Sequence, residues 1–251
     1  MARGPGNARL ALAVVIVSII VVVAAILLLR GLNPSSNTSQ HLQWGSFTKV
    51  SGGNFGSAVH VYYISWLGCP IGAANSWAFY LSLSSLGNIS THVETHYSDP
   101  YDSQPNTPGL IFNGTFTVQG IVFQPVYVYN QFMNATVNGT AIQKGSLVSV
   151  GLAELNASLP ADICAIESDA MTKMPTEGMG SLPPGPSAVA LGHINTNVIV
   201  TGSNGAWVLN GPLLNPADLS GLSSVQLLYS AAQNSAIASA SSQVSATFRE
   251  A

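Results

Sequence analysis

Cys69-Pro70-Ile71-Gly72 is the stretch that decides the fold, because it separates two segments with different hydrophobic periodicities. Residues 60–66, just before it, are almost continuously apolar, which is typical of a strand buried on both faces. Residues 73–86, just after it, carry large apolar side chains at helical spacing, namely Trp77, Tyr80, Leu83 and Leu86. The sequence therefore predicts a strand, then a turn that holds Cys69, then a helix.

This order of elements is the layout of a thioredoxin-type redox site, in which a Cys-x-x-Cys motif follows a strand and opens a helix. The second cysteine of that motif would stand at position 72, where this chain has Gly72. A lone thiol can attack a disulfide, but no neighbouring thiol is present to resolve the mixed disulfide that forms. The sequence thus predicts the scaffold of a disulfide exchanger without its dithiol.

The composition is that of a folded domain with unusually few charges. The chain has 251 residues, of which 47% are hydrophobic and 7% are charged, against roughly 25% charged residues in ordinary soluble proteins. Disordered chains combine few apolar residues with many charges, so this composition disfavours disorder. The net charge of −3, without a basic block beyond the N-terminus, lacks the electrostatic signature of nucleic-acid binding. A neutral polar surface suits an acidic or variable exterior.

Residues 10–29 form an almost unbroken apolar run that predicts a transmembrane helix. Twenty residues in a helix span about 30 Å, the thickness of the hydrocarbon core of a bilayer. Arg3 and Arg9 precede the run and Arg30 follows it, which places the N-terminus in the cytoplasm. A cleaved signal peptide is the alternative, but its apolar region would be shorter and would end in small residues. We expect a cytoplasmic N-terminus (1–9), a single-pass anchor (10–30), a flexible spacer (31–45) and an extracytoplasmic domain (46–251).

Six Asn-x-Ser/Thr sequons agree with an exterior location, because such sequons are acceptors for N-glycosylation. They are Asn37, Asn88, Asn113, Asn134, Asn138 and Asn156. An unmodified loop asparagine is the alternative for each of them.

The rest of the chain alternates between strand and helix patterns. The strand patterns cover residues 91–96, 109–112, 121–129, 193–200 and 206–209, and the helical patterns cover 147–159 and 218–250. Pro125 indicates an edge or a bulge in its strand. Ser203-Asn204-Gly205 predicts a hairpin between the last two strands. Strands that alternate with helices predict an α/β sandwich.

Five stretches of the chain resemble an uncharacterised archaeal family, domain-of-unknown-function family 929. They are Tyr63-Ile-Ser-Trp-Leu-Gly-Cys-Pro-Ile-Gly-Ala-Ala-Asn-Ser-Trp77, Leu81-Ser-Leu-Ser-Ser-Leu-Gly-Asn88, Pro105-Asn-Thr-Pro-Gly-Leu-Ile-Phe112, Phe123-Gln-Pro-Val-Tyr127 and Asn215-Pro-Ala-Asp-Leu-Ser-Gly-Leu222. The most specific of them is the Cys-Pro turn followed by a helix with a tryptophan. The resemblance implies a thioredoxin-like three-layer sandwich with insertions over most of residues 60–245. Many members of the family carry a complete Cys-Pro-x-Cys, from which this chain departs at Gly72.

Cys69 is the first candidate catalytic residue. At a helix N-terminus, free amide groups and the helix dipole would stabilise its thiolate and hold its pKa below the free value of about 8.5. Three interpretations stay open. Cys69 forms a structural disulfide with Cys164, which an exterior location permits; it is an inherited but idle thiol; or it is a working monothiol.

Pro108 is the second candidate, on the strength of the resemblance. Thioredoxin-like folds place a cis-proline just before a strand, opposite the active cysteine, where its backbone receives the substrate. The resemblance implies that residues 107–112 take that position, with Pro108 as the cis-proline. An ordinary trans turn is the alternative, because cis bonds are rare even before proline.

His92, Glu94 and His96 alternate along a predicted strand, so their side chains would share one face. Two histidines and a carboxylate suit zinc, but strand residues two apart are roughly 6.5–7 Å apart, which is wide for one ion. A solvent-facing polar strand is the better interpretation, and we expect neither a metal nor a cofactor. Asn195 and Asn197 are assigned to packing or loop roles.

Together these features favour a membrane-anchored exterior module that serves other membrane or surface proteins as a binding or accessory subunit. The second interpretation is a membrane-anchored thiol–disulfide oxidoreductase that uses Cys69, alone or with Cys164. The third is a subunit of a larger membrane or surface assembly.

Overall fold

The computed structural model describes residues 41–172, 176–177 and 192–251. The predicted anchor, the first sequon at Asn37 and most of the predicted spacer lie outside these residues. Among the helices that are described, none is long and apolar enough to cross a membrane. The described residues belong to one compact unit.

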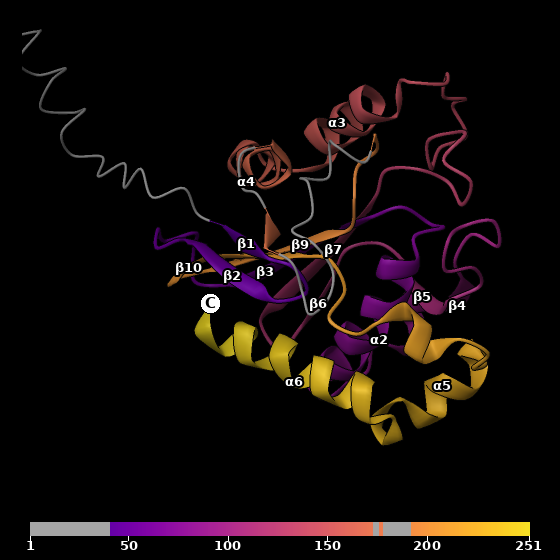
Figure 1. Ribbon diagram of the computed structural model, residues 1–251. Helices are drawn as coiled ribbons and strands as arrows, with labels where there is room; N and C mark the ends of the chain where they lie inside the picture. The colour runs from indigo at the N-terminus through magenta and orange to yellow at the C-terminus, as the bar shows by residue number, and fades with distance from the viewer. Residues whose placement is uncertain (1–40, 173–175, 178–191) are drawn as a thin grey trace, which may run out of the picture. The chain divides into compact units, whose positions relative to one another are not determined.

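A six-stranded mixed sheet forms the middle layer of the domain (Figure 1). Its strands in spatial order are β2 (Phe47–Ser51), β10 (Gly205–Asn210), β9 (Asn197–Gly202), β3 (Val59–Ser65), β7 (Ile121–Tyr127) and β6 (Phe116–Val118). The pair β3 and β7 is parallel, and every other neighbouring pair is antiparallel. Because β3 has partners on both sides, it is an interior strand, as its apolar sequence predicts.

Helices cover both faces of this sheet. Figure 1 shows α2 (Pro70–Ser84) and α6 (Ser235–Glu250) on one face, and α3 (Leu147–Ser158) and α4 (Ala161–Thr172) on the other. The shorter α5 (Ser224–Ser230) leads into α6. The buried apolar residues accordingly divide into two clusters, one on each side of the sheet. The prediction of an α/β sandwich is confirmed at this level.

Smaller elements complete the domain. The strands β4 (Val93–Tyr97) and β5 (Pro108–Phe112) form an antiparallel pair of their own, inserted between α2 and the sheet strands β6 and β7. At the other edge, β1 (Leu42–Gln43) pairs in parallel with β8 (Thr176–Glu177). The side chain of Leu42 is fully buried, so β1 packs into the domain although it lies within the range 31–45.

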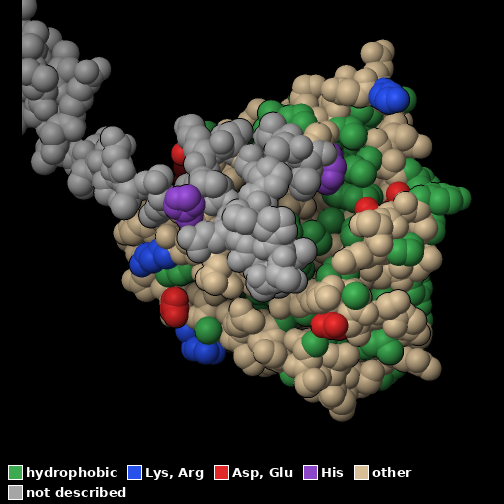
Figure 2. Space-filling model, viewed as in Figure 1, with side chains coloured by type: hydrophobic (Ala, Val, Ile, Leu, Met, Phe, Trp, Pro, Cys, Tyr) green, Lys and Arg blue, Asp and Glu red, His purple; other side chains and the backbone are tan. Residues whose placement is uncertain are grey.

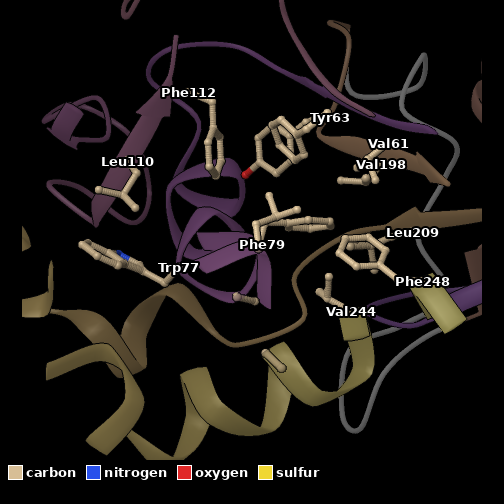
Figure 3. Close-up of a cluster of buried hydrophobic side chains, with 14 of the residues drawn as sticks. Val61, Tyr63, Trp77, Phe79, Leu110, Phe112, Val198, Leu209, Val244 and Phe248 are labelled. Atoms are coloured by element: carbon tan, nitrogen blue, oxygen red, sulfur yellow. The ribbon is translucent and has the colours of Figure 1, made fainter. Parts of the chain in front are cut away.

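Aromatic side chains fill the cluster between the sheet and α2. Figure 3 shows Phe79 of α2 between Tyr63 on β3 and the C-terminal helix. The rings of Tyr63 and Phe79 meet edge to face at 5.3 Å, and those of Phe112 and Phe123 lie 4.6 Å apart. Burial of each such side chain contributes about 1.5–3 kcal/mol relative to exposure. This cluster fixes α2, and with it Cys69, against β3.

The sequence predicted the main elements better than their packing. The hairpin at residues 203–204, the helix from 147 and the strand with Pro125 are all present. The pairing of β6 with β7 extends only from Ile121 to Phe123, so β7 has a free edge at Pro125. The predicted apolar stripe of α2 is incomplete, because Ala74 and Ala78 are fully buried as well. The helix packs against the sheet, α6 and β5 at once, so nearly all of its surface is covered.

Candidate functional site

Cys69 lies at the junction that the sequence predicts, between the end of β3 and the start of α2. It is the N-cap residue of α2, in an extended conformation (φ −67°, ψ 121°), and Pro70 is the first helical residue. The backbone N–H of Gly72 donates to Cys69 Sγ over 3.4 Å. The thiol thus takes the place of the Ser, Thr, Asp or Asn oxygen that usually accepts at a helix N-terminus.

Two buried hydroxyl groups complete a hydrogen-bonded chain to the thiol. Thr196 Oγ1 donates to Cys69 Sγ over 3.0 Å, and Ser65 Oγ lies 2.8 Å from Thr196 Oγ1. Since the Thr196 proton points to sulfur, Ser65 is the donor in the second bond. All three side chains are buried, with Cys69 only 4% exposed. The thiol is therefore enclosed by fixed partners.

Burial raises the pKa of the Cys69 thiol above its ordinary value, although hydrogen bonds from Thr196, Gly72 and Ile71 act in the opposite direction. The prediction of a lowered pKa is wrong. It considered the helix N-terminus but not the loss of water around the sulfur, which disfavours the thiolate. A thiol with a raised pKa is a poor nucleophile at neutral pH.

The space beside Gly72, where a Cys-x-x-Cys motif would have its second thiol, is filled. A Cβ atom on Gly72 would collide with Ser65 Oγ and would lie 3.2 Å from Thr196 Oγ1. The carbonyl of Gly72 also accepts a hydrogen bond of 2.5 Å from the hydroxyl of buried Tyr63. Glycine at position 72 is thus matched to its neighbours, and a cysteine there would need Ser65 to change as well.

Two loops cover the turn that precedes Cys69. The N–H of Asp99 donates to the carbonyl of Gly68 over 2.9 Å, and His96 Nε2 donates to the carbonyl of Leu67 over 2.7 Å. On the other side, a Cβ on Gly68 would collide with the carbonyl oxygen of Gln131. These contacts come from the β4–β5 insertion and from the segment after β7, so both insertions enclose the turn.

Pro108 does not have the predicted geometry. The described residues contain no cis peptide bond, so the bond before Pro108 is trans. Its carbonyl accepts from Trp77 Nε1 over 2.8 Å, and a Cβ on Gly109 would lie 2.5 Å from the Cα of Ala73. Pro108 therefore begins the strand that packs closely on α2. The segment that precedes a strand and faces Cys69 is the one that ends in Thr196, before β9.

The two cysteines are free thiols, so the Cys69–Cys164 disulfide, one of the three interpretations of Cys69, is not formed in this structure. Cys164 is partly exposed on α4, where its Sγ donates to the carbonyls of Leu155 and Leu159 over 3.4 and 3.6 Å. Burial and the nearby carboxyl groups of Glu167 and Asp162 raise its pKa. Each thiol thus has its own set of partners.

The residues that suggested a zinc site are dispersed. The ring of His92 stacks on Phe116 at 4.5 Å, Glu94 accepts from Asn113 Nδ2 over 2.9 Å, and His96 belongs to the cover of the turn. In the described part of the chain, no group of His, Cys, Asp and Glu side chains is arranged to hold a metal ion. The interpretation as an ordinary polar strand surface fits these contacts.

Five of the six sequons lie in the described residues, and all five asparagines are exposed. They are Asn88, Asn113, Asn134, Asn138 and Asn156. Glycan attachment requires exposure, which all five positions meet. Glycosylation at these positions stays a prediction.

Two hollows open on the surface, and neither is lined by the residues that surround the thiol. One of about 470 Å³ is lined by residues such as Ser82, Ser245 and Arg249, and one of about 410 Å³ by residues such as Tyr127 and Glu154. Neither wall includes Cys69, Ser65 or Thr196. The Cys-Pro turn therefore forms no part of the wall of either hollow.

Exposed apolar side chains gather on one side of the domain, which we call the β4–α5 face. Among the described residues, six of the seven exposed large apolar side chains belong to it: Tyr97, Tyr101, Phe132, Leu222, Val225 and Tyr229. The rings of Tyr101 and Phe132 lie 6.4 Å apart, and the hydroxyl of Tyr97 accepts from the N–H of Ser224 over 3.1 Å. Figure 2 shows hydrophobic side chains on the right of the molecule, where Figure 1 places β4, β5 and α5.

Sequence reasoning missed both hydroxyl residues that surround the thiol. Ser65 was visible as a polar residue at the end of an otherwise apolar strand, and Thr196 as a polar residue just before another. Their partnership with Cys69 was not visible, because Thr196 is 127 residues away from it in the chain.

Comparison with known proteins identifies a family for nearly all of the described domain. The match is to the family described as "Domain of unknown function (DUF929)" and covers residues 46–250. No curated protein matches the chain, and no solved structure matches it.

Proposed function

Because the chain belongs to the DUF929 family, which has no assigned function, we propose a role for it from its geometry. The domain is a thioredoxin-like module that has lost disulfide exchange and works as a binding or accessory subunit. It is held outside the cell membrane by the helix predicted at residues 10–30, and residues 1–9 lie in the cytoplasm.

The order of elements supports the thioredoxin-like part of this proposal. The parallel strands β3 and β7 are joined through α2, and the antiparallel hairpin β9–β10 follows and continues into α6. These four strands lie side by side in the order β7, β3, β9, β10. A Cys-Pro turn between the first strand and its helix, with the residue before β9 opposite the thiol, is the arrangement expected of that architecture.

The loss of exchange is argued from one observation: Ser65 Oγ occupies the space that a side chain at position 72 needs. A dithiol site requires a second sulfur that can attack the mixed disulfide formed on the first. Here that position has no side chain, and a Cβ there would require Ser65 Oγ to move. Cys69, buried and bonded to Thr196, instead acts as a cap of α2.

The binding part of the proposal is supported by the β4–α5 face. Large exposed apolar patches on soluble domains mark interaction surfaces. Tyr101 is 87% exposed and Phe132 is 49% exposed. They lie in the two insertions that cover the Cys-Pro turn, Tyr101 between β4 and β5 and Phe132 after β7. We assign this face to contact with another membrane or surface protein.

A disulfide-exchange assay on the full chain tests the proposal. The chain in detergent is mixed with insulin and a reductant, and the precipitation of reduced insulin is followed. The expected result is no acceleration over the reductant alone, with the same rate for Cys69→Ser. Acceleration that Cys69→Ser abolishes would refute the proposal.

A membrane-anchored thiol–disulfide oxidoreductase is the second candidate, favoured by the hydrogen bonds that Cys69 Sγ accepts. The donors Thr196 and Gly72 would stabilise a thiolate once water reached the sulfur. The thiolate would attack a substrate disulfide, form a mixed disulfide and release one substrate thiolate. An external thiol would then have to reduce the mixed disulfide, so this activity depends on a thiol co-substrate.

A further inference from the structure

We propose that Glu167 and Asn197 form a proton-dependent clasp that fastens α4 to β9 when Glu167 is neutral and loosens when it ionises. The proposal goes beyond the binding role and does not depend on it. It begins from a hydrogen bond of 2.8 Å, in which Asn197 Nδ2 donates to Glu167 Oε1. Glu167 is 1% exposed and Asn197, the first residue of β9, is fully buried.

The remaining two oxygen atoms of this pair have no hydrogen-bond partner. Glu167 Oε2 and Asn197 Oδ1 are both buried, and both are acceptors when the carboxyl group is ionised. A buried acceptor without a donor is destabilising, and a buried unpaired carboxylate is more so.

One proton on Glu167 Oε2 removes this mismatch. A neutral carboxylic acid can donate from Oε2 to the amide oxygen while its Oε1 accepts from the amide nitrogen. The result is a cyclic acid–amide pair with two hydrogen bonds, built from the two side chains that carry the unpartnered oxygens. No other group is needed to satisfy the pair.

The surroundings of the pair favour the neutral acid. On α4, Glu167 interacts with Cys164, on which Asp162 also acts, and Asp162 in turn interacts with Tyr62 on β3. On the strand side, Asn195 Nδ2 donates to Asn210 Oδ1 over 3.4 Å, so these neighbours are neutral amides. Burial raises the pKa of Glu167 from 4.5 to about 7, while the bond from Asn197 acts in the opposite direction.

The consequence for stability has a definite sign. Since the pKa of Glu167 is higher in the folded chain than in the unfolded chain, the folded chain binds more protons between about pH 4.5 and pH 7. The stabilisation is complete below pH 4.5 and decreases as the pH rises to 7, with up to a tenfold increase of the unfolding constant per pH unit. Above pH 7 both states are ionised, and this contribution to the pH dependence ends.

The location of the clasp makes its opening a local event. Glu167 is on α4, whose buried residues Ile163 and Met171 belong to the cluster between the sheet and that helix. Asn197 directly follows Thr196, which holds the thiol of Cys69. Ionisation would therefore loosen α4 and the start of β9, while the buried cluster around α2 contains no acidic side chain among the described residues.

The test compares hydrogen exchange of α4 amides in the full chain at pH 5 and pH 8, corrected for intrinsic rates. In the native chain we expect lower protection of α4 at pH 8 than at pH 5. Glu167→Gln carries an amide that can donate to Asn197 at any pH, so its α4 protection should be the same at both. Glu154→Gln on α3 is the matched control and should keep the native difference.

Two results would overturn the proposal. One is equal protection of α4 in the native chain at both pH values, and the other is an unchanged pH difference in Glu167→Gln. If that variant does not fold, the native chain still decides: its infrared spectrum at pH 6 should contain the carbonyl band of a buried protonated carboxyl group that vanishes as the pH rises past 7. Absence of the band at pH 6 would refute the clasp.

Discussion

Thr196 and Asn197 are neighbours in the chain, but they belong to two buried polar clusters that differ in one respect. In the cluster of Cys69, Ser65 and Thr196, every polar side-chain atom has a hydrogen-bond partner, and the sulfur accepts two hydrogen bonds. In the pair of Glu167 and Asn197, two oxygens are left without a donor. The comparison teaches that a completed network fixes structure, whereas an incomplete one makes the structure respond to a proton.

The largest effect should come from adding a side chain to the completed cluster. Gly72→Cys places its Cβ against Ser65 Oγ, so we expect a loss of about 1–3 kcal/mol of unfolding free energy in chemical denaturation. The double variant Ser65→Ala with Gly72→Cys should recover most of it, because the colliding hydroxyl is gone.

The control for this pair of variants is Gly52→Ala, since a Cβ at Gly52 has no atom within 4 Å. It should change stability little. If Gly72→Cys were as stable as the native chain, the claim that the second thiol position is filled would be wrong.

A smaller loss should follow removal of a single donor from the same cluster. Thr196→Val keeps the shape of the side chain but deprives Cys69 Sγ of its side-chain donor and Ser65 of its partner Thr196 Oγ1. We expect about 1–2 kcal/mol of destabilisation, from the cost of unpaired buried groups. Thr201→Val, also buried and on β9, is the matched control and should cost clearly less in the same denaturation experiment.

The incomplete pair should respond through its pH dependence. Glu167→Gln removes the group whose pKa burial raises to about 7, so the fall in stability between about pH 4.5 and pH 7 should disappear. Denaturation midpoints measured from pH 5 to pH 9 check this, and an unchanged pH dependence would contradict the assignment of the titration to this pair.

The smallest effect on stability is expected at the β4–α5 face. Tyr101→Ser and Phe132→Ser remove exposed rings, so the free energy of unfolding should stay within about 0.5 kcal/mol of the native value. Association in detergent extracts of native membranes, followed by the size of the complex on a native gel, should weaken. Val137→Ser, exposed outside this face, should not change the complex. Equal complexes for all variants would remove the role of the face.

The fold was predictable from the sequence where a pattern is local. The apolar run before Cys69, the cap position of Cys69 and the hairpin at residues 203–204 each depend on a few adjacent residues. The site was only half predictable for the opposite reason. Cys69 was identified, but its raised pKa and its partner Thr196 depend on contacts made across the fold, as does the buried position of Glu167.

For Cys69 and Pro108 the structure takes an alternative that the sequence left open, and distant packing decided both. Pro108 was placed opposite the thiol by analogy, but the close approach of Gly109 to Ala73 puts its strand along α2. The disulfide was inferred from the presence of two cysteines in an exterior chain. In the structure the thiol of Cys164 on α4 instead donates to backbone carbonyls at the end of α3, and it forms no bond with Cys69.

Competitive alkylation of the two thiols tests the central claim most directly. The native full chain is treated with a limiting amount of iodoacetamide, and the label at each cysteine is counted by mass spectrometry with and without denaturant. We predict that partly exposed Cys164 is labelled first and that buried Cys69 is labelled only when the domain unfolds. Preferential labelling of Cys69 in the native chain would contradict the claim that this scaffold no longer performs thiol chemistry.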